Sequence, residues 1–174
     1  MSEPTFSRRD YQGIVLFGVC GSGKTTVAQE LSQLLGEPHL EGDSFHPQSN
    51  INKMVSGIPL DDEDRWPWLN EIAGAIKRRV QLGEFPIVAC SALKASYRDF
   101  IVEKSQCRIL YIFLDISKNT SQSRLRGRNH FMPTSLVDSQ FATLEKPHRS
   151  EAVIVPECNS LENCIREIWA RVDF

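Results

Sequence analysis

The sequence has 174 residues, 41% of them hydrophobic, and this size predicts a single domain over residues 1–174 with a buried core. Twenty Lys and Arg residues against 22 Asp and Glu residues give a formal net charge of −2, which excludes a strong field for nucleic acid or an anionic membrane. No stretch approaches the ~18 apolar residues of a membrane-spanning helix. The five cysteines form no CxxC pair, so we expect reduced thiols in a cytoplasmic protein without nucleic-acid or membrane partners.

The first third of the chain reads as an irregular tail, a strand and a helix. Residues 1–10 are expected to be disordered or irregular, and "GIVLFGV", Gly13 to Val19, predicts a strand buried on both faces. "KTTVAQELSQLLG" predicts a helix that stops at Gly36. Its apolar residues at helical spacing are Val27, Leu31, Leu34 and Leu35.

The rest of the chain alternates apolar runs with segments of helical period. Strands are predicted in "HLEGD", "PIVACSA", "RILYIFLD" and "AVIVP". "DEDRWPWLNEIAGAIKRRVQLG" predicts a long helix that begins near Trp66 with Pro67 in its first turn, and "NSLENCIREIWARVDF" a helix capped by Asn159 or Ser160. This alternation predicts an α/β fold, a parallel sheet flanked by helices. The carboxylates of "HLEGD" would emerge at the sheet edge where such folds bind ligands.

The segment "GVCGSGKT", Gly18 to Thr25, matches the phosphate-binding pattern GxxxxGK[ST] between a strand and a helix. Glycines allow turns that aim several backbone N–H groups at one phosphate, and the helix start adds partial positive charge. Lys24 is expected to reach the β and γ phosphates of ATP during catalysis, and Thr25 to offer its hydroxyl to Mg²⁺. The alternative is a plain glycine-rich turn with a solvated Lys24. The predicted nucleotide-binding residues of this segment are Gly18, Cys20, Gly21, Ser22, Gly23, Lys24, Thr25 and Thr26.

Five later blocks follow one another in an order and spacing that resembles the gluconokinases: "EGDSFHP", "NINKMVSGIPLDDEDRWPWL", "ACSALKASYRD", "RLRGRNHFM" and "QFATLEKP". The resemblance runs from about Gly13 to Pro147. It implies a P-loop kinase fold of the nucleoside-monophosphate-kinase-like group, with a parallel five-stranded sheet flanked by helices and a mobile lid at about residues 124–135. It also implies a homodimer that phosphorylates D-gluconate at its 6-hydroxyl with ATP and Mg²⁺, giving 6-phospho-D-gluconate.

The resemblance assigns catalytic and metal roles to two carboxylates. Asp43 follows the second strand and is the candidate base for the attacking hydroxyl; the alternative is that it caps the next turn. Related kinases carry an aspartate at the position of Glu41 that assists Mg²⁺. This chain has the longer glutamate there, so a solvated carboxylate is the alternative to a metal role.

The acceptor site is expected to use His46 and Arg65. His46, in "FHP", could hydrogen-bond a hydroxyl of a polyhydroxy acid, or simply order the turn before Pro47. Arg65 follows four acidic residues, and its planar guanidinium suits a bidentate grip on the substrate carboxylate. The alternative is that Arg65 pairs locally with those acids.

Four further cations complete the predicted site. Lys94 and Arg98, four residues apart on one helical face, are placed beside the acceptor by the resemblance, and solvated cations are the alternative. In the lid block, Arg124 and Arg128 align with the lid arginines that neutralise phosphate charge, and His130 is carried over as a substrate contact. The block is one residue shorter than in the family. Its register around Arg126 and Arg128 is therefore open, and a basic helix end is the alternative.

Two features are set aside. Asp115 ends an apolar run in a loose Walker B pattern, and we assign it to capping the next helix. Cys20 stands where a serine is usual in the phosphate loop and is interpreted as a tolerated small residue. Two rival functions remain open, a kinase of another small acid such as shikimate and a non-catalytic nucleotide-binding module.

Overall fold

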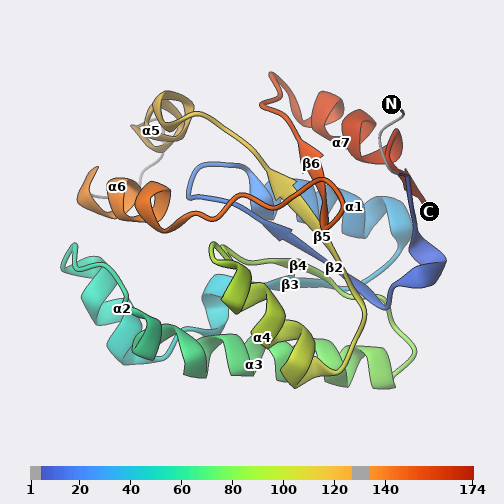
Figure 1. The fold of residues 1–174 in the computed structure, drawn as a ribbon, viewed down its shortest axis with the longest axis horizontal. Coiled ribbons are helices and arrows are strands. Elements are labelled where there is room, and N and C mark those ends of the chain that lie inside the picture. The colour runs from blue at the N-terminus through green and yellow to red at the C-terminus, as the bar shows by residue number, and fades with distance from the viewer. Residues whose placement is uncertain (1–4, 127–133) are drawn as a thin grey trace.

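The computed structural model describes residues 5–126 and 134–174. Its centre is a five-stranded parallel sheet with the order β3-β4-β2-β5-β6 (Figure 1). The strands are β2 (Gly13–Phe17), β3 (His39–Glu41), β4 (Ile87–Ala89), β5 (Ile109–Leu114) and β6 (Ala152–Val155). The predicted α/β fold and its five-stranded parallel sheet are therefore confirmed.

Helices cover both faces of this sheet, with α3 and α4 on one side and α1 and α7 on the other (Figure 1). The helices are α1 (Lys24–Leu35), α2 (Gln48–Val55), α3 (Asp62–Gln81), α4 (Ala95–Ser105), α5 (Lys118–Arg126), α6 (Thr134–Thr143) and α7 (Leu161–Trp169). Short 3₁₀ turns occupy η1 (Arg8–Asp10) and η2 (Gly42–Phe45). No helix in residues 5–126 and 134–174 has the length and apolar character needed to cross a membrane.

The core has two layers because side chains alternate along each strand. Ile14 and Leu16 of β2 face the cluster that includes Leu31 of α1, whereas Val15 and Phe17 face the cluster of α3 and α4. The prediction that Leu34 belongs to the apolar face of α1 is wrong, since its side chain is 54% exposed. Val27, Leu31 and Leu35 are four residues apart and share the buried face, which Leu34 does not.

The amino-terminal segment is more regular than expected. β1 (Phe6–Ser7) pairs in parallel with β7 (Val172–Asp173), with Phe6 opposite Val172. η1 follows directly, and Phe6 and Tyr11 pack against the core. The predicted irregular tail is therefore wrong for residues 6–10. Their partner strand lies at the other end of the chain, where a local sequence pattern does not reveal it.

Helix α3 begins four residues before the predicted start near Trp66. The Asp61 side chain accepts from the Asp64 N–H, and the Asp64 side chain accepts from the Asp61 N–H, which forms a capping box. Pro67 therefore lies inside the helix rather than in its first turn. The acidic residues Asp62, Glu63 and Asp64 form the first turn of the helix, since carboxylates are favoured there.

The caps of helices α7 and α5 can be compared with those predicted from the sequence. Ser160 caps α7 by accepting from the Asn163 N–H, as predicted. Asp115 does not cap α5, because its carboxylate pairs with Lys146. The Ser117 hydroxyl takes that role and accepts from the Thr120 N–H at 3.2 Å. Ser117 lies directly before the helix, at the position from which a cap can reach the first-turn amides.

Candidate active site

The phosphate loop connects β2 to α1, and Gly18 and Gly23 show why it needs glycine. Gly18 has φ 145°, and a Cβ there would lie 2.9 Å from the carbonyl oxygen of Leu114. Gly23, the residue before α1, has φ 95°, but a Cβ there would meet nothing within 4 Å. Backbone conformation therefore requires glycine at Gly23, while the space in front of the helix start is open. An anion can approach the first amides of the 12-residue helix α1 through this space.

Lys24 is the cation of this loop. Its Nζ donates to the backbone carbonyl of Val19 at 2.9 Å, so the side chain bends back over the loop. Burial lowers the pKa of Lys24, and the nearby Asp43 opposes this effect. The buried Ser22 hydroxyl has no hydrogen-bond partner among the residues that the structure describes. The cation of Lys24 and the buried, unpaired hydroxyl of Ser22 fit a phosphate group at this loop.

Cys20 is held on both sides by helices α5 and α6. Its N–H donates to the Gln140 side chain at 2.7 Å, and its carbonyl accepts from the Ser121 hydroxyl at 2.8 Å. Arg124 donates to the carbonyls of Gly21 and Ser22 at 3.3 and 3.4 Å, as well as to that of Cys158. The guanidinium of Arg124 therefore supports the loop from its carbonyl side. Its predicted contact with phosphate stays a prediction.

A cavity of about 110 Å³ adjoins the loop. Five of the predicted site residues line it: Cys20, Lys24, Asp43, His46 and Arg65. The other residues that line it are Met54, Pro59, Leu60, Trp68, Ser91, Leu136, Ser139 and Gln140. The cavity thus brings one carboxylate, one imidazole and one guanidinium to the lysine of the phosphate loop.

Asp43 lies in η2, directly after β3, and its side chain is 79% exposed. The indole N–H of Trp68 donates to the carbonyl of Gly42 at 2.7 Å, which fixes η2 against α3. Gly42 also lies against β4, since a Cβ there would meet the Ala89 carbonyl oxygen at 2.5 Å. The residue before the candidate base is therefore fixed by a hydrogen bond on one side and by close packing on the other.

His46 follows η2 and is almost fully buried. Its ring stacks on Trp68 with centroids 4.2 Å apart and an interplanar angle of 14°. Its Nε2 lies 4.0 Å from Asp43 Oδ1. Burial lowers the pKa of His46, Asp43 partly offsets this, and the positive Arg65 lowers it further. The neutral imidazole is thus favoured beside the candidate base.

Arg65 is 7% exposed and projects from the second turn of α3. Its Nε and Nη2 donate to the carbonyl of Leu60 at 3.3 and 3.1 Å, and its guanidinium lies over the Tyr97 ring. Two of the preceding acids have other partners, since Asp62 binds Lys94 and Asp64 binds Lys53. Among the described residues, Arg65 has no ion pair, so the alternative of local pairing is wrong. A buried guanidinium without a carboxylate is suited to binding an anion.

The structure does not bring every predicted residue to this cavity. Arg98 is buried beneath the loop after β4, where it donates to the carbonyls of Ala92, Leu93 and Glu145 and lies over Phe17. Carbonyls thus occupy its Nη1 and Nη2 away from the cavity, and the predicted contact of Arg98 with the substrate stays a prediction. Lys94 is paired with Asp62 in a separate shallow depression that Arg65 also lines.

The predicted metal ligands are not among the described residues that line this cavity. Glu41 does not line the cavity, and its buried Oε2 lies 3.8 Å from His39 Nε2. Thr25 and Thr26 are exposed in the first turn of α1. Arg128 and His130, with most of the predicted lid, lie outside the described residues.

Gln140 is the main site residue that the sequence analysis did not single out. It belongs to the block "QFATLEKP", which carried part of the resemblance, so its segment was identified without its contact. The hydrogen bond from Cys20 joins residues 120 positions apart. No local pattern predicts such a pairing.

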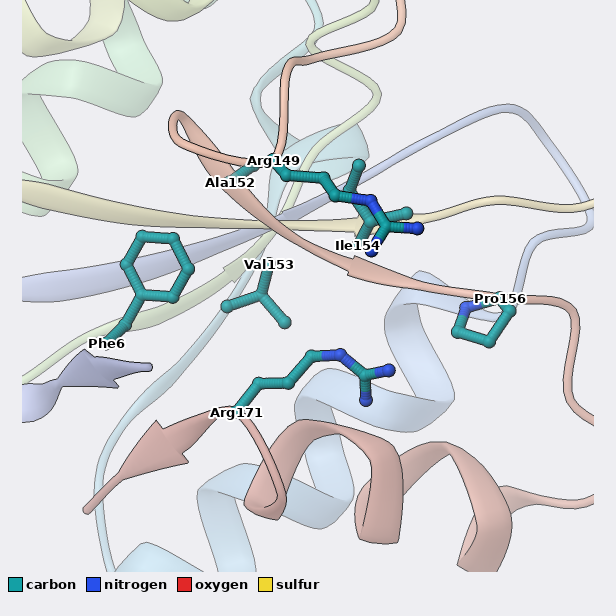
Figure 2. Close-up of a pocket in the computed structure, with 7 residues that line it drawn as sticks. All are labelled: Phe6, Arg149, Ala152, Val153, Ile154, Pro156 and Arg171. Atoms are coloured by element: carbon teal, nitrogen blue, oxygen red, sulfur yellow. The ribbon is translucent and has the colours of Figure 1, made fainter. Parts of the chain in front are cut away.

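A second cavity of about 130 Å³ lies at the edge of β6, beside β1 and β7 (Figure 2). Its lining residues are Phe6, Arg149, Ala152, Val153, Ile154, Pro156 and Arg171. Figure 2 shows the side chains of Arg149 and Arg171 on opposite sides of the cavity. None of the predicted site residues lines it, and we assign no function to it.

The strand, loop and helix around Lys24, built on this sheet order, define the fold of a P-loop kinase. A family model described as an AAA domain matches residues 14–147. Shikimate kinase from Bacteroides thetaiotaomicron shares the fold, with a TM-score of 0.62 and 16% identity over 90% of this chain and 94% of that one.

Proteins with higher sequence identity show to which family of P-loop kinases the chain belongs. Thermosensitive gluconokinase of Escherichia coli (strain K12) is 41% identical over 83% of this chain and 77% of that protein. Gluconokinase of Gluconobacter oxydans (strain 621H) is 44% identical over 81% of this chain and 79% of that protein. A gluconokinase structure from Sinorhizobium meliloti 1021 has a TM-score of 0.83 and 42% identity, covering 94% of this chain and 92% of that chain. The chain belongs to the gluconokinase family.

Proposed function

We propose that this enzyme transfers the γ-phosphoryl group of ATP to the 6-hydroxyl of D-gluconate, giving ADP and 6-phospho-D-gluconate. The observation that carries the proposal is the single cavity that Lys24, Asp43, His46 and Arg65 share. The lysine marks the phosphate end of this cavity and the guanidinium offers a partner for a carboxylate. Relatives at 41–44% identity that bear the name gluconokinase support the choice of acceptor.

The nucleotide end of the site is the loop from Gly18 to Thr26. Its backbone amides and the start of α1 would bind the phosphates, and Lys24 would leave the Val19 carbonyl to pair with the transferring group. The exposed Thr25 hydroxyl would hold Mg²⁺, which supplies neutralisation of phosphate charge when bound. Glu41 is a weaker candidate for this metal, because it does not line the cavity.

The acceptor end uses three side chains on two elements. D-gluconate carries its carboxylate and its 6-hydroxyl at opposite ends of a six-carbon chain. Arg65 would bind the carboxylate bidentately, and His46 would hydrogen-bond a hydroxyl. Asp43 would then receive the proton of the attacking hydroxyl as the new O–P bond forms. Positioning and charge neutralisation supply most of the acceleration, and no covalent enzyme intermediate is needed.

The roles of the lid and of the other predicted site residues, the cellular location and the oligomeric state stay predictions. Arg124 and Arg128 would neutralise phosphate charge, and Lys94 and His130 would contact the acceptor, as the family resemblance implies. We also propose a cytoplasmic enzyme, because all five cysteines are free thiols, as expected in a reducing compartment. The proposed homodimer can be tested by light scattering in solution.

A coupled assay of ADP release with D-gluconate, other six-carbon sugar acids and shikimate tests the proposal. We expect the largest kcat/KM for D-gluconate. A preference for shikimate would favour the rival kinase, although the shikimate kinase fold neighbour shares only 16% identity. ATP binding without any acceptor-dependent ADP release would instead indicate a nucleotide-binding module and would refute the proposed reaction.

A further inference from the structure

Asn50, on helix α2, is a buried polar residue that the proposed mechanism does not use; its exposure is 1%. Its side-chain nitrogen lies 2.8 Å from the backbone carbonyl oxygen of Asp64 and 3.3 Å from Nδ1 of His46. Asn50 thus connects α2, the first turn of α3 and the imidazole of the candidate site. Burying an amide costs free energy unless the amide is hydrogen-bonded, and these two contacts offset that cost at Asn50.

The Asp64 carbonyl fixes which end of the Asn50 amide faces His46. A backbone carbonyl only accepts hydrogen bonds, so the amide nitrogen must face it. The reversed amide would set its own oxygen against this carbonyl. One N–H of the amide therefore donates to Asp64, and the second N–H is the group that faces Nδ1 of His46.

This contact decides the proton position on the His46 ring. The NH₂ group of Asn50 cannot accept, so Nδ1 must present its lone pair and the proton of the neutral ring must lie on Nε2. An imidazolium would set one N–H against another. A ring turned over by 180° would keep its stacking on Trp68, but it would set Cδ2 in place of Nδ1 against the Asn50 amide and lose this hydrogen bond. Nε2 lies on the side of Asp43, 4.0 Å from its Oδ1.

We infer that Asn50 is a positioning residue that holds His46 as the neutral Nε2–H tautomer and so makes this nitrogen a hydrogen-bond donor to a hydroxyl oxygen of the bound sugar acid. The identity of the acceptor rests on the proposed function, whereas the tautomer does not. The charged groups that face His46 are Asp43 from η2 and Arg65 from α3. Asn50 is uncharged, so it can set the tautomer without changing the net effect of Asp43 and Arg65 on the charge of His46.

The tautomer can be measured directly on the full-length wild-type protein. Long-range ¹H–¹⁵N correlation spectra of ¹⁵N-histidine-labelled protein at neutral pH distinguish a protonated ring nitrogen from a bare one. The His46 signals are assigned from their loss in His46→Gln. We expect Nε2 to be protonated and Nδ1 to be bare. A spectrum with the proton on Nδ1 would overturn the inference, whatever the activity of the enzyme.

Asn50→Asp tests the positioning role, because a carboxylate of the same shape only accepts and would favour a proton on Nδ1. We expect the tautomer to change and KM for D-gluconate to rise about tenfold, with little change in KM for ATP. Asn52→Asp makes the same change at an exposed position of the same helix and should alter neither quantity. An unchanged tautomer in folded Asn50→Asp would contradict the inference.

The two proposals fail in distinguishable ways. If D-gluconate proves not to be a substrate, the proposed function fails, yet an Nε2–H tautomer that is lost in Asn50→Asp still supports the positioning role. If D-gluconate is phosphorylated while the wild-type ring carries its proton on Nδ1, the positioning role fails and the proposed function stands.

Discussion

The side chain of Gln140 accepts a hydrogen bond from the backbone N–H of Cys20 at 2.7 Å and so connects α6 to the phosphate loop. The Ser121 hydroxyl of α5 donates to the carbonyl of the same residue. The backbone N–H of Cys20 is thus bound by α6, and its backbone carbonyl is bound by α5. The shape of the phosphate loop therefore depends on side chains more than 100 positions away in the sequence.

Gln140→Met removes the acceptor and leaves the Cys20 N–H unpaired. An unsatisfied amide costs about 1–3 kcal/mol, so we expect a lower melting temperature and a KM for ATP that rises more than KM for D-gluconate. Steady-state kinetics with each substrate varied in turn measures this difference. Gln29→Met, on the exposed face of α1, is the matched control. Equal increases in both KM values would argue against a specific effect on the phosphate loop.

Asp43→Asn removes the proposed base while it preserves the size of the side chain. General-base catalysis contributes about 10²–10⁴-fold, so kcat should fall by a factor in that range. Binding of ATP, measured by calorimetry, should change little. Asp99→Asn on the exposed face of α4 should leave kcat unchanged. A kcat within twofold of wild type would remove Asp43 from the mechanism.

Gly42→Ala tests whether close packing positions the candidate base. The added methyl group would meet the Ala89 carbonyl oxygen at 2.5 Å, so η2 must move away from β4. Overpacking of this kind costs about 1–3 kcal/mol, and we expect a lower free energy of unfolding together with a lower kcat.

Gly74→Ala adds the same group inside helix α3, where the nearest atom is the far end of the Arg78 side chain at 3.4 Å. Alanine is a better helix former there, so this control should stabilise the protein by about 0.5–1 kcal/mol. Urea denaturation compares the two variants. Equal stability of both would contradict the packing argument at Gly42.

Arg65→Lys keeps the charge and loses the planar fork. A charge-assisted hydrogen bond contributes about 1.5–3 kcal/mol, so KM for D-gluconate should rise roughly 10- to 150-fold. The KM for ATP should change little, since Lys24 and the loop bind the phosphates. Arg166→Lys, at an exposed surface pair on α7, is the control. An unchanged KM for D-gluconate would place the substrate carboxylate elsewhere.

Stability should fall in mild acid because of His46. Burial lowers the pKa of this imidazole in the folded protein, whereas the unfolded chain titrates near pH ~6.5. The unfolded state therefore binds the proton first as the pH falls, and the free energy of unfolding decreases from pH ~6.5 down to the folded pKa. His46→Gln should show a flatter pH dependence in urea denaturation between pH ~8 and ~5, whereas His148→Gln, at an exposed position, should not. Identical slopes for wild type and His46→Gln would refute this assignment.

The sequence predicted those parts of the site that depend on local order. The phosphate loop requires glycine, lysine and threonine at fixed spacing between a strand and a helix, and the structure has this arrangement around Lys24. Asp43 was placed correctly at the carboxyl end of β3, because the carboxyl ends of parallel strands share one edge. Arg65 was identified as an anion-binding candidate from its chemistry, and its burial without an ion pair among the described residues agrees with that reading.

The errors concern contacts between distant segments. The prediction that Lys94 and Arg98 share a helical face is wrong, since Lys94 has extended backbone just before α4 and pairs with Asp62. The Arg98 side chain instead extends beneath the loop after β4 to the carbonyl of Glu145. The start of α3 was predicted near Trp66 because the capping box between Asp61 and Asp64 was not recognised in the sequence. Asn50 was overlooked because an asparagine on a short helix has no distinctive pattern until its two partners are known.

The parallel pair β1 and β7 has a consequence for the order in which the chain can fold. The central sheet is complete once β6, which ends at Val155, has been synthesised. Phe6 can find its partner Val172 only after Val172 itself has left the ribosome. Closing so long a loop carries a large entropic cost, which only an already formed core can offset. Phe6 and Ser7 are synthesised before the central sheet and are therefore among the last residues to acquire their native neighbours.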